Sequence, residues 1–418
     1  CADVLPRRFI FSEEQSFMLE LEDAQQRILN AIQPLPIERV ALADAHGCFA
    51  AENVVSEVHL PPFDNAAMDG YAVQAKDVAN ATGENPVPLK LIGRVAAGER
   101  FSGTVTPGTC VRLFTGSPLP EGADSVVMQE DTELDSTTPG QVRFKDLVKM
   151  WENVRFRGED VKPGQILIQT GDKINAGGLA LLAASGLCNL SVRRRPVIGL
   201  IATGSELVEP GHPLGAGQIH ESNRAGLACL TRAAGAIPHI FPMVRDTLED
   251  TSTALKRAFA AYVAVVTSGG VSVGEMDFVK SAFEAIGGQL DFWKVAIKPG
   301  KPFVWGRWKN KYLFGVPGNP VSALVTFTLL VQPALLRLHG ASECLPETVP
   351  SMLAEPFSNP GDRRHFVRVR LDATGNVRSS GVQSSHILSS LAQANALLDL
   401  PPKSHFAAGQ AVSIIRWE

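Results

Sequence analysis

The chain lacks the features that identify disulfide-rich, zinc-binding and membrane-spanning proteins. Its six cysteines are far apart and show no paired spacing, which argues against a zinc cluster or a disulfide framework and predicts a reducing, cytoplasmic location. The longest apolar run, Leu324 to Leu338, is interrupted by Thr326 and Pro333, so it predicts a buried helix and no membrane span. A signal-peptide pattern is also missing. Because the first residue is Cys1 and not methionine, we expect a chain that has been trimmed, tagged or cut from a longer one.

An excess of charge of one sign is lacking as well. The formal net charge is only -4, so no global field attracts the chain to nucleic acid or to acidic membranes. The run Arg193-Arg194-Arg195 resembles a nucleic-acid patch, but three adjacent arginines before a strand are more often a solvated edge, and we favour that reading. We therefore expect no nucleic-acid partner. At 418 residues the chain is too long for one ordinary core, which predicts several domains.

The hydrophobic pattern changes along the chain in a way that indicates separate domains. Apolar residues at helical spacing over 20–33 predict a helix that Pro34 ends. Short β-type runs between glycine, proline and aspartate turns predict a β-rich domain over 55–150, followed by mixed α/β structure over 160–195 with a helix near 176–186. The part after about 345 alternates polar and apolar residues and predicts a small β-barrel or sandwich.

From Pro196 onward, strands and helices alternate regularly. Strands are expected at 197–202, 237–244, 262–267, 292–297 and 312–316, and helices at 222–234, 248–261 and 277–286 and after 320. Ser222 and Asn223 suit the start of the first of these helices, and Gly235 suits its end. The alternation predicts a doubly wound parallel α/β domain.

Two glycine-rich turns in this α/β region each follow a β-type run, at 268–277 and 315–322. Such loops present backbone N–H groups to an anion. They fit neither a dinucleotide fingerprint nor a P-loop, which disfavours a nicotinamide- or nucleotide-dependent enzyme. Between them lie Lys294, Lys298 and Lys301, of which we expect the first two on one strand face. Lysines in this position are either snorkelling surface residues or, as we favour, part of a tetrahedral oxyanion or phosphate site.

Polar side chains just past the carboxyl ends of parallel strands face the ligand crevice in such a sheet. The candidates in that position are Glu206, Asp246, Ser272 with Asp277, the three lysines, and Asn319 with Ser322. Each alone has an ordinary structural explanation, but their convergence on one edge favours a site. In the segments that contain Asp69 and Asp160 an acidic residue also abuts a glycine, as in Asp69-Gly70 and Gly158-Glu159, which leaves a carboxylate accessible for a metal or for proton transfer.

Several longer segments make the comparison with a known family specific. They are PFDNAAMDGYAV at 62–73, TGSP at 115–118, RGED at 157–160, TGSEL at 203–207, SNR at 222–224, the loop 268–277, KPGKP at 298–302, PGNPVS at 317–322 and SSH at 384–386. In these segments, and in their order over almost the whole chain, the protein resembles the MoeA-type molybdopterin molybdenumtransferases, which also occur as the E domain of gephyrin and of plant Cnx proteins.

The resemblance implies a four-part fold and a homodimer. The parts are a discontinuous linker domain (1–54 and 151–195), an inserted β-rich domain (55–150), a MogA-like α/β domain that binds molybdopterin and molybdate (196–340), and a C-terminal β-barrel (341–418). The implied active cleft joins the α/β and barrel domains of one subunit to the β-rich domain of the other. The implied reaction takes molybdate and adenylylated molybdopterin and gives molybdenum cofactor and AMP with the help of Mg²⁺.

The same resemblance implies roles for individual residues. The molybdate-binding set is Lys298, Lys301, Ser322, Arg363 and Ser385, with Lys294 beside them. Residues toward the pterin and AMP are Thr115, Gly269, Gly270, Ser272, Pro317, Asn319 and Pro320. The catalytic acidic residues are Asp69, Asp160, Glu206, Asp246 and Asp277, with Glu206 and Asp246 as the Mg²⁺ ligands.

Partners follow from the same comparison. We expect a MogA-type protein or domain that supplies adenylyl-molybdopterin, and molybdenum enzymes or their chaperones that receive the product. The alternative function is a scaffold on the same fold, an E domain that also binds a receptor. Intact acidic and lysine positions favour the enzyme, because a pure scaffold would not need them.

Overall fold

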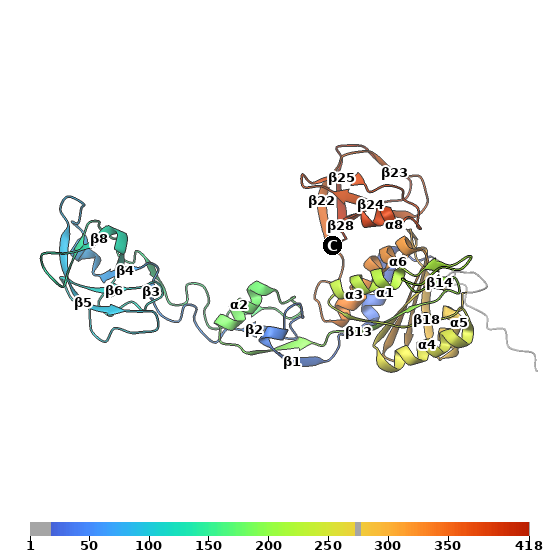
Figure 1. Cartoon of the computed structure of the whole chain (residues 1–418), viewed down its shortest axis with the longest axis horizontal. Helices are drawn as coiled ribbons and strands as arrows, with labels where there is room; N and C mark the ends of the chain where they lie inside the picture. The colour runs from blue at the N-terminus through green and yellow to red at the C-terminus, as the bar shows by residue number, and fades with distance from the viewer. Residues whose placement is uncertain (1–17, 272–276, 418) are drawn as a thin grey trace, which may run out of the picture.

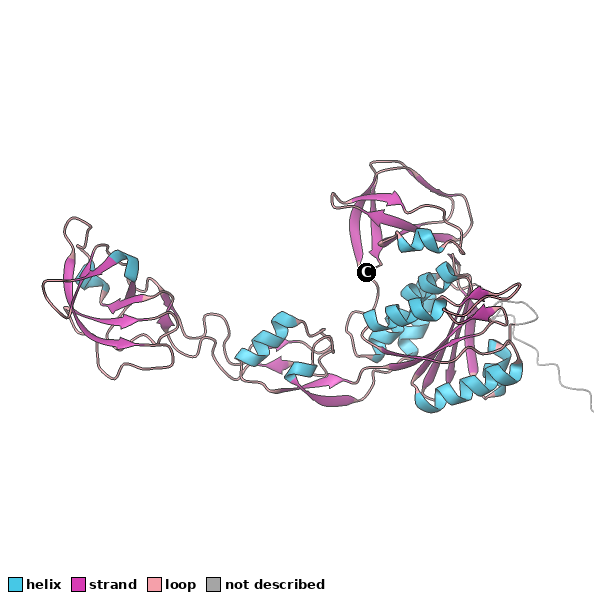
Figure 2. Cartoon of the chain, viewed as in Figure 1, coloured by secondary structure: helices cyan, strands magenta, loops and turns pink. Residues whose placement is uncertain are grey.

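The structure, a computed structural model, describes residues 18–271 and 277–417 of the chain. The molecule is elongated (Figure 1). A β-rich part forms one end, a slender α/β part lies in the middle, and a larger α/β part with a second β-rich part forms the other end (Figures 1 and 2). The chain runs out to the far end and back again, because the middle is built from antiparallel pairs of segments far apart in sequence. These pairs are β1 (Ile37–Ala41) with β12 (Asn189–Arg193), β2 (Val54–Val55) with β11 (Ile166–Ile168), and β3 (Asn65–Ala66) with β10 (Val154–Arg155).

The larger α/β part is built on a six-stranded sheet. Its strands in spatial order are β16 (Ile237–Ile240), β13 (Val197–Ala202), β17 (Ala264–Ser268), β21 (Lys311–Val316), β20 (Pro302–Trp308) and β18 (Gln289–Lys294). The first four are parallel, and β20 runs antiparallel to both β21 and β18. Every residue of β17 is buried, as expected for a strand covered on both faces.

Helices cover both faces of this sheet because successive residues of its strands point to opposite sides. On one side Leu200, Val266 and Phe314 pack with α1 (Leu21–Ala31), α3 (Asn223–Ala233) and the helix after β21. On the other side Val265 and Leu313 pack with α4 (Leu248–Ala261) and α5 (Val279–Ala285). The expected doubly wound α/β class is confirmed.

Two details of the expected strand pattern are wrong. The strand expected over 237–244 ends at Ile240, and only an isolated bridge joins Val244 to Thr203. The strand expected over 292–297 is split: β18 ends at Lys294, and β19 (Ile297–Lys298) belongs to another sheet. Val295, Ala296 and Ile297 are all buried, so the apolar pattern alone could not reveal that the chain changes sheets between them.

The helix after β21 is continuous from α6 (Pro320–Thr326) through a π-helical turn, η5 (Phe327–Val331), into α7 (Gln332–Leu338). Within the described part of the chain, the stretch Pro320–Leu338 is the one helix whose length and composition match a membrane span. However, 78% of its apolar window is buried inside the protein. It therefore serves as the core helix that the sequence predicted.

The distal β-rich part contains a six-stranded sheet with the order β7 (Ser125–Met128), β4 (Gly70–Val73), β6 (Thr109–Leu113), β5 (Val87–Val95), β9 (Gln141–Phe144) and β8 (Thr132–Leu134). Two separate hydrophobic clusters line it, one around Val73 and Phe144 and the other around Val111 and Val126. The middle part adds α2 (Ala176–Ala184) and short 3-10 turns, whose apolar residues form a small core of their own.

The C-terminal part is a closed sheet. Its order is β19, β24 (Arg364–Leu371), β25 (Asn376–Ser379), β22 (Thr348–Leu353), β28 (Ala411–Arg416) and β26 (Ala396–Leu400), and β24 also pairs with β26. A short pair, β23 (Phe357–Asn359) with β27 (Ser404–Phe406), and helix α8 (Leu388–Ala392) complete it. Because the sheet closes on itself, the C-terminal part is a barrel and not the sandwich that the sequence also allowed. The strand β19 contains Lys298 and directly follows β18 of the α/β sheet in the chain. The α/β part therefore contributes one strand to this barrel.

Candidate active site

A pocket of about 770 Å³ opens at the carboxyl edge of the α/β sheet. Its walls come from the loops that follow β13, β16, β17 and β21, and from the segment 386–388 of the barrel. The pocket residues that the sequence predicted are Glu206, Asp246, Gly269, Gly270, Asp277, Pro317, Asn319, Pro320 and Ser322. The convergence of these residues follows from the topology, because β16, β13, β17 and β21 are parallel neighbours and end at the same edge.

Carboxylates gather on one side of the pocket. Glu206 follows β13 and Asp246 follows β16, the strand beside it. Burial raises the pKa of Asp246, and the negative charges of Glu206 and Asp277 raise it further. The Ser205 N–H donates to Asp246 Oδ2 at 3.1 Å and opposes that rise. Neighbouring like charges disfavour the ionised form of this carboxyl.

The acidic side chains fit Mg²⁺, which takes oxygen ligands and usually keeps several waters while using one or two carboxylates and substrate phosphates. Within residues 18–271 and 277–417, no group of three or more His, Cys, Asp or Glu side chains is placed to hold a metal ion by itself. Glu206 and Asp246 are the two pocket carboxylates that could contribute oxygen ligands to such an ion. Ser272 lies outside the described residues.

The two glycine loops form the floor between these carboxylates and α6. Gly269 has φ +89°, and a Cβ there would lie 2.5 Å from the Thr203 carbonyl oxygen; Gly270 has φ +65°. Only glycine fits such a combination of backbone angle and close approach. Asn223 Nδ2 ties the two loops together, donating to Ser268 Oγ at 2.7 Å and to the Gly318 carbonyl at 2.7 Å. The buried Asn223 Oδ1 has no hydrogen-bond partner among the described residues.

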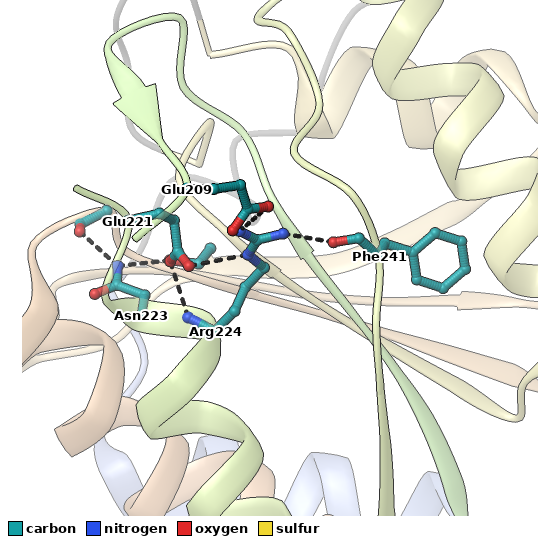
Figure 3. Close-up of polar contacts among 7 residues, drawn as sticks. Glu209, Glu221, Asn223, Arg224 and Phe241 are labelled. Carbon is teal, nitrogen blue, oxygen red and sulfur yellow. Dashed lines mark hydrogen bonds and ion pairs between the residues drawn. The ribbon is translucent and has the colours of Figure 1, made fainter. Parts of the chain in front are cut away.

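A buried ion-pair cluster fixes the loop that carries Glu206 (Figure 3). Arg224 on α3 is 3% exposed, and its Nε donates to Glu221 Oε2 at 2.9 Å. Its Nη2 reaches Glu209 Oε1 at 2.8 Å, and its Nη1 reaches the Phe241 carbonyl at 2.5 Å. The guanidinium therefore joins α3 to the residue after β16. It also joins α3 to the residues just after β14 (Leu207–Val208) and β15 (Ile219–His220), which form a short parallel pair. A lysine could not make these contacts, because it lacks the planar fork.

The same cluster corrects the expected helix start. Ser222 occupies the N-cap position of α3 but makes no side-chain capping bond. Glu221 Oε1 instead accepts the Arg224 N–H at 2.9 Å. A carboxylate suits this end of the helix because the helix dipole favours negative charge there.

The side chains of Lys294, Lys298 and Lys301 are not part of the pocket lining, although Pro302, which follows Lys301, is. Lys298, in β19, is opposite His365 of β24, and Arg363 Nη1 donates to the Ile297 carbonyl at 3.0 Å. Lys301 precedes Pro302, which lines the pocket, and is exposed. The expectation that Lys294 and Lys298 share one strand face is wrong, because Lys294 ends β18 of the α/β sheet.

Ser385 of the C-terminal barrel also lies beside the pocket, at the start of α6. Its carbonyl accepts the Val321 N–H at 3.2 Å, and its neighbour His386 lines the pocket beside Ser322. Burial, and then the charges of Lys298, Arg368 and Arg363, lower the pKa of His365 to about 4. The junction of the two parts is thus a cationic corner next to an acidic pocket.

Three predicted residues lie elsewhere in the chain. Asp69 precedes β4 in the distal sheet, where its Oδ1 accepts both the N–H and the hydroxyl of Thr115 at 2.7 Å each. These two bonds, the backbone one first, lower the pKa of Asp69. Asp160 is exposed near β10, and its N–H donates to the Leu60 carbonyl. Figure 1 places β4 and α3 at opposite ends of the molecule, so Asp69 and Thr115 do not reach the pocket of their own chain.

Several residues near the site were not singled out by the sequence reasoning. His220, Glu221 and His386 line the pocket, and Lys280 on α5 is close enough to Asp277 and Lys294 for their charges to act on it. Burial is the main cause that lowers the pKa of Lys280. Glu221 directly precedes the quoted segment at 222–224, and His386 is the last residue of the quoted segment at 384–386; these positions were the signal that could have assigned them to the site.

A mostly parallel sheet with a polar pocket at its carboxyl edge, carboxylates on one side and cations nearby, defines the class of multidomain α/β proteins that have a ligand crevice at this edge. Comparison with known proteins narrows this class. Residues 19–186 match the MoeA N-terminal region (domain I and II), 199–337 a probable molybdopterin binding domain, and 351–417 the MoeA C-terminal region (domain IV).

Similar proteins match over nearly their whole length. A molybdopterin molybdenumtransferase of Haemophilus influenzae is 36% identical over 408 residues, which is 95% of this chain and 98% of that protein. One of Staphylococcus epidermidis is 34% identical over 97% of each chain. The crystal structure of the molybdopterin biosynthesis MoeA protein of Pyrococcus horikoshii superposes with a TM-score of 0.81 at 30% identity, covering 96% of this chain and 100% of that one. The chain belongs to the MoeA-type molybdopterin molybdenumtransferase family, whose members take part in molybdenum cofactor biosynthesis.

Proposed function

We propose that this protein inserts molybdate into adenylylated molybdopterin, releasing AMP and giving molybdenum cofactor. The observation that carries the proposal is the arrangement of charge at one sheet edge. Glu206 and Asp246 line a pocket beside two glycine loops, and the cationic corner of Lys298 and Arg363 adjoins it. The reaction needs an acidic side that holds a cation for the pyrophosphate and a cationic side that binds the incoming oxyanion, and this sheet edge has both kinds of side chain.

The acidic side would hold the pyrophosphate through Mg²⁺. Glu206 and Asp246 are its proposed ligands, and Asp277 acts on the same corner through its charge. When bound, Mg²⁺ would supply charge neutralisation and polarisation at the bridging phosphates. The residues of the chain have the further task of orienting the pterin and AMP, for which Gly269, Gly270, Ser272, Pro317, Asn319 and Pro320 are the proposed contacts. Asn223 supports this role because it fixes both glycine loops.

The cationic side would bind molybdate. Its proposed members are Lys298, Lys301, Ser322, Arg363 and Ser385, with Lys294 beside them. Ammonium and guanidinium groups make strong charge-assisted hydrogen bonds to a tetrahedral oxyanion. Ser322 and Ser385 lie on segments that the Val321–Ser385 backbone bond holds together. Molybdate would thus bind where the barrel and the α/β part meet.

We also propose a homodimer in which a second copy completes the cleft. Asp69 and Thr115 can contribute to the reaction only if the distal part of another subunit covers the pocket. Asp160 is proposed to come from the same second subunit. Exposed apolar side chains near Asp69 suit an interface; they are Phe63, Met68, Met150, Trp151 and Phe156. The segments that carry them lie side by side, since Ala67 N–H donates to the Asn153 carbonyl. Large exposed apolar side chains on neighbouring segments suit an interaction site.

The remaining expectations stand as part of the same proposal. The four domains are 1–54 with 151–195, 55–150, 196–340 and 341–418, and most of the hydrophobic clusters group within these limits. The protein is proposed to act in the cytoplasm, receiving adenylyl-molybdopterin from a MogA-type protein. It would deliver its product to molybdenum enzymes or their chaperones.

The test separates the two halves of the site. Glu206→Gln and Asp246→Asn should each abolish Mg²⁺-dependent AMP release from adenylyl-molybdopterin and molybdate, because an amide lacks the negative charge that the carboxylate contributes to binding Mg²⁺. Molybdate binding, measured by calorimetry without the pterin, should survive in both. Glu249→Gln, an exposed carboxylate in the first turn of α4, is the matched control and should change neither. Near-normal AMP release by Glu206→Gln and Asp246→Asn would show that these carboxylates only order their loops.

A further inference from the structure

Two arginines lie directly opposite each other on neighbouring strands of the distal sheet. Arg94 of β5 and Arg112 of β6 are register partners, so their side chains point to the same face. Like charges directly opposite across two strands destabilise a sheet. The same sheet also contains the favourable arrangement, in which Arg143 of β9 is opposite Glu133 of β8 and pairs with it at 3.8 Å. The repulsion between Arg94 and Arg112 therefore needs another explanation.

Neither member of this arginine pair has a carboxylate partner. Within the described residues, no Asp or Glu oxygen lies within 4.0 Å of a side-chain nitrogen of Arg94 or Arg112. Asp69 is near Arg112, but the two bonds from Thr115 lower the pKa of Asp69 more than the charge of Arg112 does. The positive charge of the pair is therefore not cancelled by the chain that carries it.

Aromatic rings hold the two guanidinium groups in place. Arg112 Cζ lies 4.9 Å from the ring centroid of Tyr71 and 5.2 Å from that of Phe114. Arg94 Cζ lies 4.9 Å from the centroid of the same Phe114 ring. Ring faces attract a guanidinium without neutralising it. Because stacking leaves the N–H groups at the edge of the guanidinium plane, the pair keeps both its charge and hydrogen-bond donors for an anion.

Hydrogen bonds join the arginine pair to Asp69. Arg112 Nη1 donates at 3.4 Å to the carbonyl of Gly70, the residue after Asp69, and Nη2 donates to Gln129 Oε1. The Gln129 N–H in turn donates to the Asp69 carbonyl at 3.0 Å. Thr115 binds Asp69 Oδ1 from the same side chain and backbone that the sequence singled out. Any ligand that reaches Asp69 and Thr115 is therefore also close to Arg112.

We propose that Arg94 and Arg112 bind phosphate groups of the substrate in the pocket of a second copy of this chain. The inference rests on the proposed function and on its homodimer, in which Asp69 of one chain covers the pocket of the other. Two neighbouring guanidinium groups suit the oxygens of a pyrophosphate, because each offers N–H donors in a planar fork. The bound anion relieves the repulsion within the pair.

The first experiment measures substrate affinity in Arg94→Met, Arg112→Met and wild type. Each substitution should raise the KM for adenylyl-molybdopterin at least about tenfold, because it removes a charge-assisted bond to phosphate, and should change the KM for molybdate less than about twofold. Calorimetric binding of AMP in the presence of Mg²⁺ should weaken in parallel. Arg143→Met is the matched control, since Arg143 is an arginine of the same sheet that has a carboxylate partner, and it should match wild type.

A mixed dimer shows which chain the arginine serves. In a hybrid of Arg112→Met with Asp246→Asn, the one intact pocket belongs to the chain that lacks Arg112, and the other chain supplies that arginine. The hybrid, isolated with two different affinity tags, should therefore have the wild-type KM for adenylyl-molybdopterin. A raised KM in the hybrid would show that Arg112 acts within its own chain and would overturn the proposal.

Three further results would overturn the inference. One is a wild-type KM for adenylyl-molybdopterin in Arg94→Met and Arg112→Met proteins that melt like wild type. Another is an equal rise in the KM values for both substrates, which indicates general damage to the fold. The third is a fully active monomer. If Arg112→Met does not fold, Arg94→Met decides alone, because Arg94 is exposed. If wild type binds AMP but releases none from adenylyl-molybdopterin and molybdate, the proposed function fails, and calorimetry with AMP still tests the arginine pair.

Discussion

Single charged side chains in this protein differ in how their charge is compensated, and that difference separates structural from functional residues. Arg224 is saturated by two carboxylates and a carbonyl, as expected of a residue that fixes a loop. Arg364 likewise pairs with Asp399 and Glu22, which raises its pKa and joins the barrel to α1. Among the described residues Arg112 has no such compensation, and Asp246 faces like charge. Asp246 lies where Mg²⁺ is proposed to supply the missing opposite charge.

The lysines give a direct residue-level prediction. Lys298→Ala and Lys301→Ala should each weaken molybdate binding by about 1.5–3 kcal/mol, or roughly ten- to a hundredfold, since each removes a charge-assisted contact with an oxyanion. Isothermal titration with molybdate measures this. Lys256→Ala, an exposed lysine of α4, is the control. Unchanged affinity in both lysine variants would place the oxyanion elsewhere.

His339 gives a pH-dependent prediction. It is fully buried against Phe49, neither ring nitrogen has a partner among the described residues, and burial, then Arg195 and Lys173, lower its pKa to about 4. Between that value and the ordinary value of about 6.5, the unfolded chain binds a proton that the folded chain does not, so stability is lost as the pH falls. The slope should be up to about 1.4 kcal/mol per pH unit.

The measurement for His339 is a series of denaturant unfolding curves between pH 4.5 and 7. His339→Leu should flatten the pH dependence in this window, because the titrating ring is gone. His405→Leu, at an exposed position in β27, should keep the wild-type dependence. Identical pH profiles for wild type and His339→Leu would contradict the assignment.

At the scale of elements, the loops after parallel strands and one crossing strand build the site. The glycine loop after β17 depends on backbone geometry that other residues rarely adopt. The strand β19 lends two residues to the barrel sheet and so fixes Lys298 between two parts of the protein. Binding at such a junction is sensitive to small shifts of either part, because the contacts come from both.

The glycine loop yields an element-level prediction. Gly269→Ala should destabilise the protein by about 1–3 kcal/mol, because it combines a left-handed backbone with a Cβ 2.5 Å from the Thr203 carbonyl oxygen. Gly318→Ala in the other loop is the matched control, since its Cβ would approach nothing closer than 3.7 Å. Thermal melting compares the two. Equal melting temperatures for Gly269→Ala and wild type would mean that the loop relaxes without strain.

At the scale of the whole molecule, the elongated shape separates residues that the proposed reaction needs together. Asp69 lies at the end opposite to the pocket, so a compact single-chain site is ruled out for it. In an isologous dimer Asp69 could reach a pocket, because a two-fold axis can bring the distal part of each subunit to the pocket of the other. Each cleft would then draw on both chains.

Mixed dimers test this arrangement. Asp69→Asn and Asp246→Asn homodimers should both be inactive, but hybrids that carry one of each should regain one intact cleft and about half the wild-type activity. The hybrids can be isolated by two different affinity tags and assayed for AMP release. A stable monomer with full activity in sedimentation, or hybrids as inactive as the parents, would exclude a shared cleft.

The sequence by itself determined the α/β class, most strand and helix positions, and the carboxylates at the pocket. β13 and α4 have the expected limits, and Glu206 and Asp246 follow neighbouring strands as expected. This succeeded because the order of parallel strands fixes which loops meet, and the hydrophobic period reveals the strands. The domain limits and the roles of individual site residues remain predictions.

Only the tertiary structure decided which distant segments complete the site. The buried run Val295 to Ile297 does not show that the chain leaves one sheet for another, because burial looks the same in both. The partners of Arg224 and Arg112 likewise depend on how distant segments pack, which local pattern does not encode. Periodicity records which side of an element is buried, whereas the identity of the neighbour on that side is set by long-range packing.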